Sequence, residues 1–87
     1  MDRSPAVYIL ASGRHGTLYV GVTSNLPKRI WEHRSELADG FTKRYRVHRL
    51  VYFECFGDMI TAITREKRLK RTGRADKIRL IENANPR

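Results

Sequence analysis

Two short apolar runs joined by a tight polar turn most constrain what this chain can fold into. The runs occupy residues 7–11 and 18–22, and the link at 12–16 contains two glycines. Short apolar runs bounded by glycine-containing turns are typical of strands, and a link of this length predicts an antiparallel hairpin. Tyr8 and Tyr19 therefore fall on neighbouring strands.

A helix is expected directly after this hairpin. Residues 23–25 are all candidate N-caps, and Pro27 suits a first helical turn because its missing N–H has no helical partner there. We expect this helix to end at Asp39 and Gly40. At about 100° per residue, its apolar stripe contains Leu26, Ile30 and Leu37.

Two polar side chains share the orientation of that stripe. His33 falls inside it and Arg29 lies at its edge, so both are expected to lean toward the sheet. A single histidine on an apolar helix face is more often a packed core residue than a catalyst. Here, however, it lies one turn from an arginine that points the same way.

One more strand and two more helices complete the predicted fold. Residues 50–56 form an apolar run that we interpret as the third strand, and helices are expected at 59–71, after an N-cap at Asp58, and at 74–83. The core-facing positions of these helices are Met59, Ala62, Ile63 and Leu69 in the first and Ala75, Ile78 and Ile81 in the second. The prediction is a single α+β domain over 1–87, with the order ββαβαα and a small three-stranded antiparallel sheet flanked by helices.

Glu66 is the sharpest local anomaly in the sequence. It falls near the middle of the apolar face of the helix at 59–71, between the directions of Met59 and Ala62. An unpaired carboxylate on such a face is costly, so it needs a cation, either a metal or an arginine, and Arg29 is the expected arginine. Lys70 lies on nearly the same face, but from the last turn it can extend to water.

Composition excludes several classes of protein. Cys55 is the only cysteine, which excludes an intrachain disulfide and a thiolate zinc cluster, and within the run at 50–56 we expect its thiol to be buried and inert. No apolar run approaches the roughly 18 residues of a membrane-spanning helix, and the first residues do not resemble a secretion signal. A cytoplasmic location is expected.

The charge balance points to a polyanionic partner. Eighteen Lys and Arg residues against nine Asp and Glu residues give a net charge of +9, which favours nucleic acid. The segment at 41–49 interleaves cations with Phe41 and Tyr45, as suits backbone phosphates and unstacked bases, although one of these rings anchored in the core explains it equally well. The candidate nucleic-acid-binding residues are Lys28, Arg34, Lys43, Arg44, Tyr45 and Arg46.

The hairpin and first helix carry, in order, the residues Tyr8, Tyr19, Gly21, Arg29 and His33. This pattern resembles the signature of the GIY-YIG endonuclease superfamily. The two triplets read Ala6-Val7-Tyr8 and Tyr19-Val20-Gly21, so alanine replaces the first glycine of the signature. The resemblance extends to Glu66 and covers almost the whole chain, which looks like a short stand-alone bacterial member related to the catalytic domain of an excinuclease. Asn83 is either a further counterpart or only a helix cap.

The resemblance implies an active site formed by Tyr8, Tyr19, Arg29, His33 and Glu66. It also implies that Glu66 holds one Mg²⁺ or Mn²⁺ ion per site, with waters and phosphate oxygens completing the shell. The guanidinium fork of Arg29 matches a phosphate. We favour Tyr8 as general base with His33 as its relay and Tyr19 as the group that orients water or phosphate; the reverse assignment of the two tyrosines stays open.

The leading hypothesis is a metal-dependent endonuclease that hydrolyses DNA phosphodiester bonds by one-metal chemistry, in DNA repair or recombination. A chain of this size leaves no room for a separate reading domain, so target choice is expected to come from DNA structure, from a partner protein or from dimerisation of a monomer or weak dimer. The strongest alternative is a nucleic-acid-binding module of the same fold that cuts slowly or not at all. A third is an interaction protein whose basic face meets an acidic partner.

Overall fold

The computed structural model describes residues 4–13, 16–35 and 46–85. The elements, in chain order, are β1 (Ala6–Ala11), β2 (Leu18–Thr23), α1 (Leu26–Arg34), β3 (Arg49–Cys55), α3 (Met59–Lys70) and α4 (Arg74–Ala84). The predicted α+β fold with the order ββαβαα is confirmed over this part of the chain.

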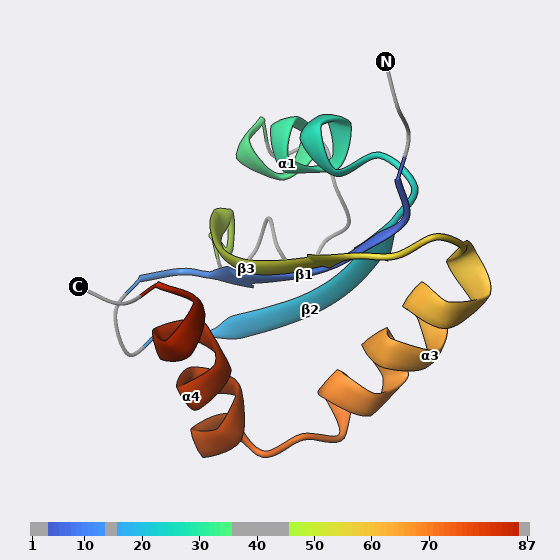
Figure 1. The fold of residues 1–87 in the computed structure, drawn as a ribbon. Helices are drawn as coiled ribbons and strands as arrows, with labels where there is room; N and C mark the ends of the chain where they lie inside the picture. The colour runs from blue at the N-terminus through green and yellow to red at the C-terminus, as the bar shows by residue number, and fades with distance from the viewer. Residues whose placement is uncertain (1–3, 14–15, 36–45, 86–87) are drawn as a thin grey trace.

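The three strands form one antiparallel sheet in the order β2-β1-β3. Strand β1 lies in the middle, and all six of its residues are buried. In Figure 1 the sheet separates α1, on one face, from α3 and α4, on the other. A strand covered on both faces is apolar throughout, which is why the run at 7–11 lacks polar alternation.

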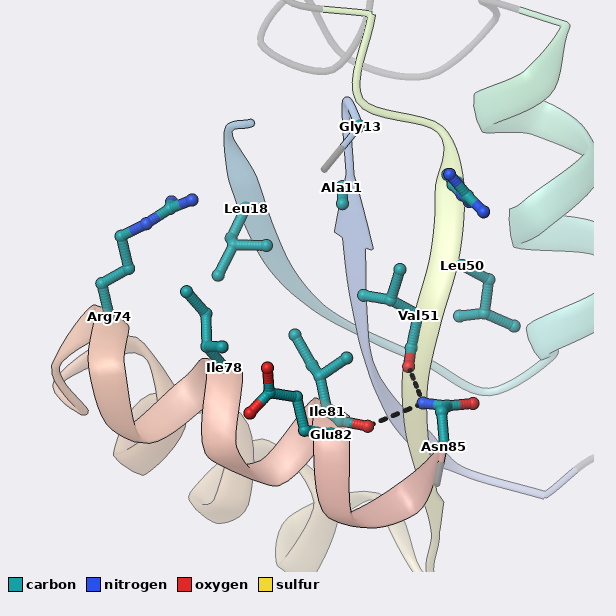
Figure 2. A pocket seen from close by; sticks show the side chains of 11 residues that line it. Ala11, Gly13, Leu18, Leu50, Val51, Arg74, Ile78, Ile81, Glu82 and Asn85 are labelled. Atoms are coloured by element: carbon teal, nitrogen blue, oxygen red, sulfur yellow. Dashed lines mark hydrogen bonds between the residues drawn. The ribbon is translucent and has the colours of Figure 1, made fainter. Parts of the chain in front are cut away.

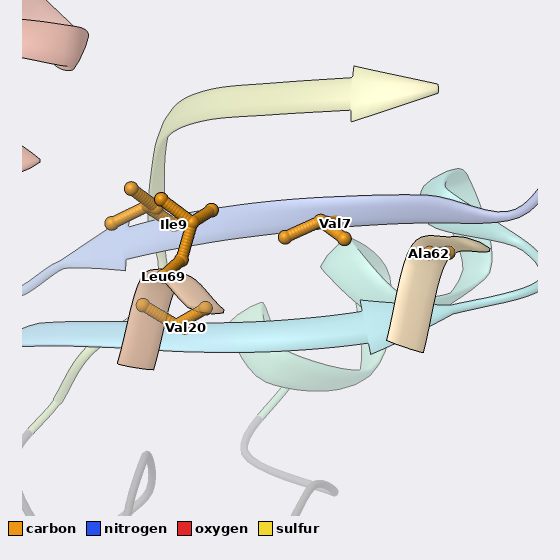
Figure 3. Packing of buried hydrophobic residues seen from close by; sticks show 5 residues of the cluster. All are labelled: Val7, Ile9, Val20, Ala62 and Leu69. Carbon is orange, nitrogen blue, oxygen red and sulfur yellow. The ribbon is translucent and has the colours of Figure 1, made fainter. Parts of the chain in front are cut away.

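Alternate residues of β1 supply two separate cores. Val7 and Ile9 point toward α3, where they pack with Val20, Ala62 and Leu69 (Figure 3). The second core, on the α1 face, is formed by Tyr8, Leu10 and Val47, against which Tyr19, Leu26, Ile30 and Leu50 pack. Full burial of one large aliphatic side chain contributes roughly 1.5–3 kcal/mol, so both clusters stabilise the fold.

The helix starts follow the predicted cap chemistry. The Asn25 side chain accepts a hydrogen bond from the backbone N–H of Lys28 at 3.3 Å, and Pro27 lies in the first turn of α1. Asp58 caps α3 in the same way through the N–H of Thr61 at 2.7 Å. Such caps satisfy N–H groups that lack partners inside the helix.

The predicted end of the first helix is wrong. Helix α1 ends at Arg34 with Ser35 as its C-cap, before the stop expected at residues 39 and 40. Serine competes for backbone hydrogen bonds and is a weaker helix former than the residues before it, which is consistent with an early end. Leu37, Asp39 and Gly40 lie outside the described residues.

Three burial predictions are also corrected. Cys55 is exposed, because β3 is an edge strand and this residue is its last position. Ile63 is exposed because the buried side of α3 runs through Ala62, Glu66 and Leu69, roughly a quarter turn away. Ala75 is exposed in the first turn of α4, whereas Ile78 and Ile81 are half-buried as predicted. None of the helices in the described ranges is long and apolar enough to cross a membrane.

Candidate active site

The centre of the candidate site is the hydroxyl of Tyr8, a side chain that is 1% exposed. It lies 3.0 Å from Nε2 of His33 and receives a hydrogen bond from Nε of Arg29 at 3.3 Å. Tyr19 completes the group, because the centroid of its ring lies 6.4 Å from that of Tyr8 and 5.7 Å from that of His33. The structure therefore brings together four of the five predicted catalytic residues on the α1 face.

Strand register and a glycine set this arrangement. Tyr8 is paired with Gly21, and Leu10 with Tyr19, so both tyrosines point to the same side of the sheet. The ring of Tyr8 lies directly over Gly21, where any Cβ would overlap its hydroxyl end. Glycine at this position is what allows Tyr8 to lean across β2 toward α1.

The Tyr8 hydroxyl is hydrogen-bonded to two basic side chains. The Tyr8 oxygen accepts the Nε–H of Arg29, and the direction of its hydrogen bond with Nε2 of His33 follows the tautomer of the imidazole. In the tautomer with its proton on Nδ1, Nε2 of His33 is the acceptor for the phenolic proton. The guanidinium that donates to the Tyr8 oxygen is the group able to stabilise a phenolate there, because a nearby positive charge and a donated hydrogen bond both favour the anion.

Arg29 is held between Tyr8 and an acidic residue that the sequence analysis missed. Its Nη1 lies 3.2 Å from Oε1 of Glu32, three residues further along α1. The hydrogen bond with Tyr8 raises the pKa of Arg29 above its ordinary value, burial acts in the opposite direction, and Glu32 adds to the rise. Spacing alone offered a signal for Glu32, since residues three apart face each other on a helix.

A polar cavity of about 410 Å³ opens beside this group. It lies where β2 ends and α1 begins, and Met59 of α3 contributes to its wall. Lys28, Arg29 and Glu32 supply its charged groups. We refer to it as the α1 cavity, and it gives the exposed side of Arg29 room for an anionic ligand.

Glu66 has the predicted burial and an unexpected partner. The residue is 9% exposed on the buried side of α3, and Nζ of Lys70 lies 2.8 Å from its Oε2. The required cation is thus Lys70, and Arg29 pairs with Glu32 instead. Glu66 lies on α3, which covers the other face of the sheet, two turns after Met59 and on about the same side of the helix. Met59 lines the α1 cavity, and Glu66 does not.

Comparisons with known proteins agree with this geometry. The family model of the GIY-YIG catalytic domain matches residues 4–79. The chain belongs to the GIY-YIG family. A UPF0213 protein of Syntrophus aciditrophicus is 38% identical over 81 residues, covering 92% of this chain and 91% of the relative. UPF0213 protein CPE1444 of Clostridium perfringens is 38% identical over 77 residues, covering 88% of this chain and 82% of the relative.

A solved relative has the same fold. The solution NMR structure of UPF0213 protein BH0048 from Bacillus halodurans superimposes with a TM-score of 0.58 at 28% identity, covering 95% of this chain and 87% of that one. It matches the three-stranded GIY-YIG arrangement found here. The names of these relatives state neither a metal nor a substrate.

The metal-binding side chains of this GIY-YIG chain suit a site in which a single protein carboxylate holds the ion. The described residues contain no cluster of three or more His, Cys, Asp or Glu side chains able to enclose an ion. A Mg²⁺ ion needs no such cage, because it binds through one or two carboxylates and keeps waters and substrate phosphates as its other ligands. The buried carboxylate of Glu66, already facing a cation in Lys70, fits that requirement.

A larger cavity of about 550 Å³ lies elsewhere in this GIY-YIG fold, between α4 and the sheet. Figure 2 shows its apolar floor, with Asn85 at one end donating to the carbonyl oxygens of Val51 and Ile81, each at 2.8 Å. Asn85 is also the C-cap of α4. The interpretation of Asn83 as that cap is therefore wrong, and the asparagine that ties α4 to β3 was missed.

The predicted nucleic-acid contacts are only partly within the described residues. Lys28, Arg34 and Arg46 have exposed side chains, and Lys28 borders the α1 cavity. Arg46 has a φ of 55°, a left-handed conformation that is uncommon outside glycine and asparagine. Lys43, Arg44 and Tyr45 lie outside the described part of the chain.

Proposed function

We propose that this protein is a metal-dependent endonuclease that hydrolyses DNA phosphodiester bonds with Tyr8 as general base. The observation that carries the proposal is the hydrogen-bonded series Arg29, Tyr8 and His33, in which Tyr8 and His33 are buried. A phenol has a pKa near 10 and is a poor base at neutral pH unless cations stabilise its anion. Arg29 donates to the phenolic oxygen, and in this proposal His33 takes the phenolic proton.

The reaction assigns one task to each group. Tyr8, having passed its proton to His33, accepts a proton from the attacking water; the water oxygen bonds to phosphorus as the phosphorus–oxygen bond to the leaving strand breaks. Arg29 meets the developing charge on the phosphate from the α1 cavity, and Tyr19 orients the water or the phosphate. Glu66 would hold one Mg²⁺ or Mn²⁺ ion, which when bound supplies positive charge for the leaving oxygen.

DNA is the proposed substrate because the net charge of the chain and the cations that line the α1 cavity both favour an anionic ligand. The net charge of +9 favours a polyanion, and the α1 cavity is lined by Lys28 and by Arg29, which also donates to the phenolic oxygen of Tyr8. We propose recognition of DNA structure in preference to sequence, by a monomer or weak dimer. A partner protein is a further source of specificity, and DNA repair or recombination is the proposed setting.

A second candidate function follows from the ion pair at Glu66. Because Lys70 already neutralises this carboxylate, metal binding has to displace an ammonium that lies 2.8 Å away. If a metal ion rarely displaces Lys70 from Glu66, the protein binds DNA but cleaves it slowly or not at all. That is the binding module considered as the main alternative.

The test is cleavage of duplex, single-stranded, nicked and branched DNA with Mg²⁺ or Mn²⁺. We expect Tyr8→Phe to leave DNA affinity nearly unchanged and to reduce the cleavage rate by about 10² to 10⁴, the usual contribution of a general base. Glu66→Gln should abolish Mg²⁺-dependent cleavage while the protein stays folded. Affinity that falls steeply with salt, without cleavage of any substrate, identifies the binding module. A Tyr8→Phe protein that cleaves normally contradicts the assignment of the base.

A further inference from the structure

The ion pair between Arg29 and Glu32 differs from a surface ion pair. The side chains of Arg29 and Glu32 are only 33% and 27% exposed, and the same guanidinium also donates to Tyr8. The pair Arg79 and Asp76 on α4 has the same spacing and a similar distance, 3.3 Å, but its side chains are 70% and 66% exposed. The two pairs are alike in chemistry and differ in what the arginine touches.

We infer that Glu32 is a positioning residue for Arg29. The carboxylate accepts from Nη1 while Nε donates to Tyr8, so two points fix the plane of the guanidinium. The remaining N–H groups are then available to meet a phosphate in the α1 cavity, which Arg29 and Glu32 both line. The inference rests on the proposed function, since it assigns Glu32 to the same site.

The negative charge of Glu32 should weaken DNA binding, whereas its hydrogen bond to Arg29 should support catalysis. A carboxylate at the cavity wall repels a phosphate, so by charge alone its removal should strengthen DNA binding. By geometry its removal should loosen Arg29, which has several rotatable bonds, and weaken catalysis. A positioning residue therefore affects kcat and KM differently, whereas a phosphate-binding residue would raise KM when removed.

Two substitutions at this position separate charge from geometry. Glu32→Ala removes both the charge and the hydrogen-bond acceptor, and we expect kcat to fall by about tenfold or more while KM stays the same or decreases. Glu32→Gln keeps an oxygen acceptor for Nη1 without the charge, and should restore most of the lost kcat. Asp76→Asn, in the exposed pair on α4, is the matched control and should leave both parameters unchanged.

Other outcomes overturn the inference. Unchanged or faster turnover in Glu32→Ala would mean that Glu32 only competes with the phosphate for Arg29. A Glu32→Gln protein as slow as Glu32→Ala, with weaker Mn²⁺ binding measured by titration calorimetry, would mean that the charge matters and that Glu32 is a metal ligand.

A readout independent of cleavage keeps the inference separate from the proposed function. The Nε–H of Arg29 should give a slowly exchanging NMR signal in the wild type and in Glu32→Gln, and lose that protection in Glu32→Ala. If no form of the protein cleaves DNA, the nuclease proposal fails and this measurement still tests the role of Glu32. Equal protection in the wild type and in Glu32→Ala shows that Arg29 does not depend on Glu32.

Discussion

The central strand β1 contributes side chains to both faces of the sheet, and the contacts of these side chains differ between the two faces. On the α1 face, β1 contributes Tyr8, whose hydroxyl is hydrogen-bonded to an imidazole and to a guanidinium. On the α3 face, the neighbouring residues Val7 and Ile9 belong to an apolar cluster (Figure 3). Strand alternation thus lets one six-residue segment support stability on one side and polar chemistry on the other.

Polar contacts occur on the second face as well, but they have a different character. Arg65 of α3 donates from Nε and Nη2 to the carboxylate of Glu54 at 3.0 Å each, and the hydroxyl of Tyr52 also donates to that carboxylate. These groups join α3 to the edge strand β3 and border neither of the described cavities. We therefore predict that changes in the apolar cluster and in the Arg65–Glu54 contact of the α3 face alter stability, whereas changes near Tyr8 alter turnover.

Leu69→Ala should produce the largest stability effect. Leu69 is fully buried between α3 and the sheet, and truncation of such a side chain usually costs about 2–5 kcal/mol. Urea unfolding measures the loss, and kcat of the remaining folded protein should be unchanged. Ile60, 80% exposed on the same helix, provides the control, because Ile60→Ala should stay within about 0.5 kcal/mol of the wild type. A large drop in kcat for Leu69→Ala at full folding would break the distinction between the faces.

Gly21→Ala tests the α1 face with a single methyl group. The new Cβ would overlap the end of the Tyr8 side chain, so the ring has to move away from β2. Overpacking of this kind costs about 1–3 kcal/mol, and the displaced hydroxyl should lose its contacts with Arg29 and His33. We expect cleavage to fall by about 10² or more, as for a misplaced catalytic group, alongside the modest loss of stability. Normal cleavage with reduced stability would show that the position of Tyr8 is not critical.

Much of this architecture was predictable because its signals are local. The glycine-containing turn predicted the hairpin, and Asn25 and Asp58 predicted helix starts through cap chemistry. Helical periodicity predicted that Arg29 and His33 lean toward the sheet, and their contacts with Tyr8 confirm that orientation. The catalytic roles of these residues stay predictions.

Most of what the sequence did not predict depends on the assembled fold. Cys55 is exposed because its strand forms an edge of the sheet, and strand order follows from packing of the whole chain. The expected partner of Glu66 was a metal or Arg29, with Lys70 extending to water, whereas Nζ of Lys70 lies 2.8 Å from its Oε2. The i,i+4 spacing was a local signal for this pair that the sequence analysis set aside. From the sequence alone, Asn83 and Asn85 are equal candidates for the cap of α4. The folded structure favours Asn85, because its side chain also donates to the backbone carbonyl of Val51.

Glu54→Gln should have the smallest effect, and its pH dependence is its signature. Burial raises the pKa of Glu54, but the hydrogen bonds from Arg65 and Tyr52 outweigh it and hold the pKa below the ordinary value of 4.5. A group with a lowered pKa in the folded state stabilises the protein above the unfolded pKa, and this contribution disappears as pH falls through the folded pKa. The Glu54 carboxylate therefore contributes stability above about pH 4.5 and loses it in more acidic solution.

Replacement by glutamine removes the charge and the titration together. At neutral pH we expect Glu54→Gln to lower the free energy of unfolding by about 1–2 kcal/mol, in the range of a hydrogen bond to a charged group. Because the variant cannot titrate at this position, the gap between its stability and that of the wild type should narrow as pH falls below 4.5. Urea unfolding on both sides of that pH measures the gap, with Asp76→Asn as the exposed ion-pair control. A stability difference that stays constant with pH would show that the Arg65 contact does not favour the charged form of Glu54. A change in kcat at neutral pH would show that Glu54 affects the site on the other face of the sheet.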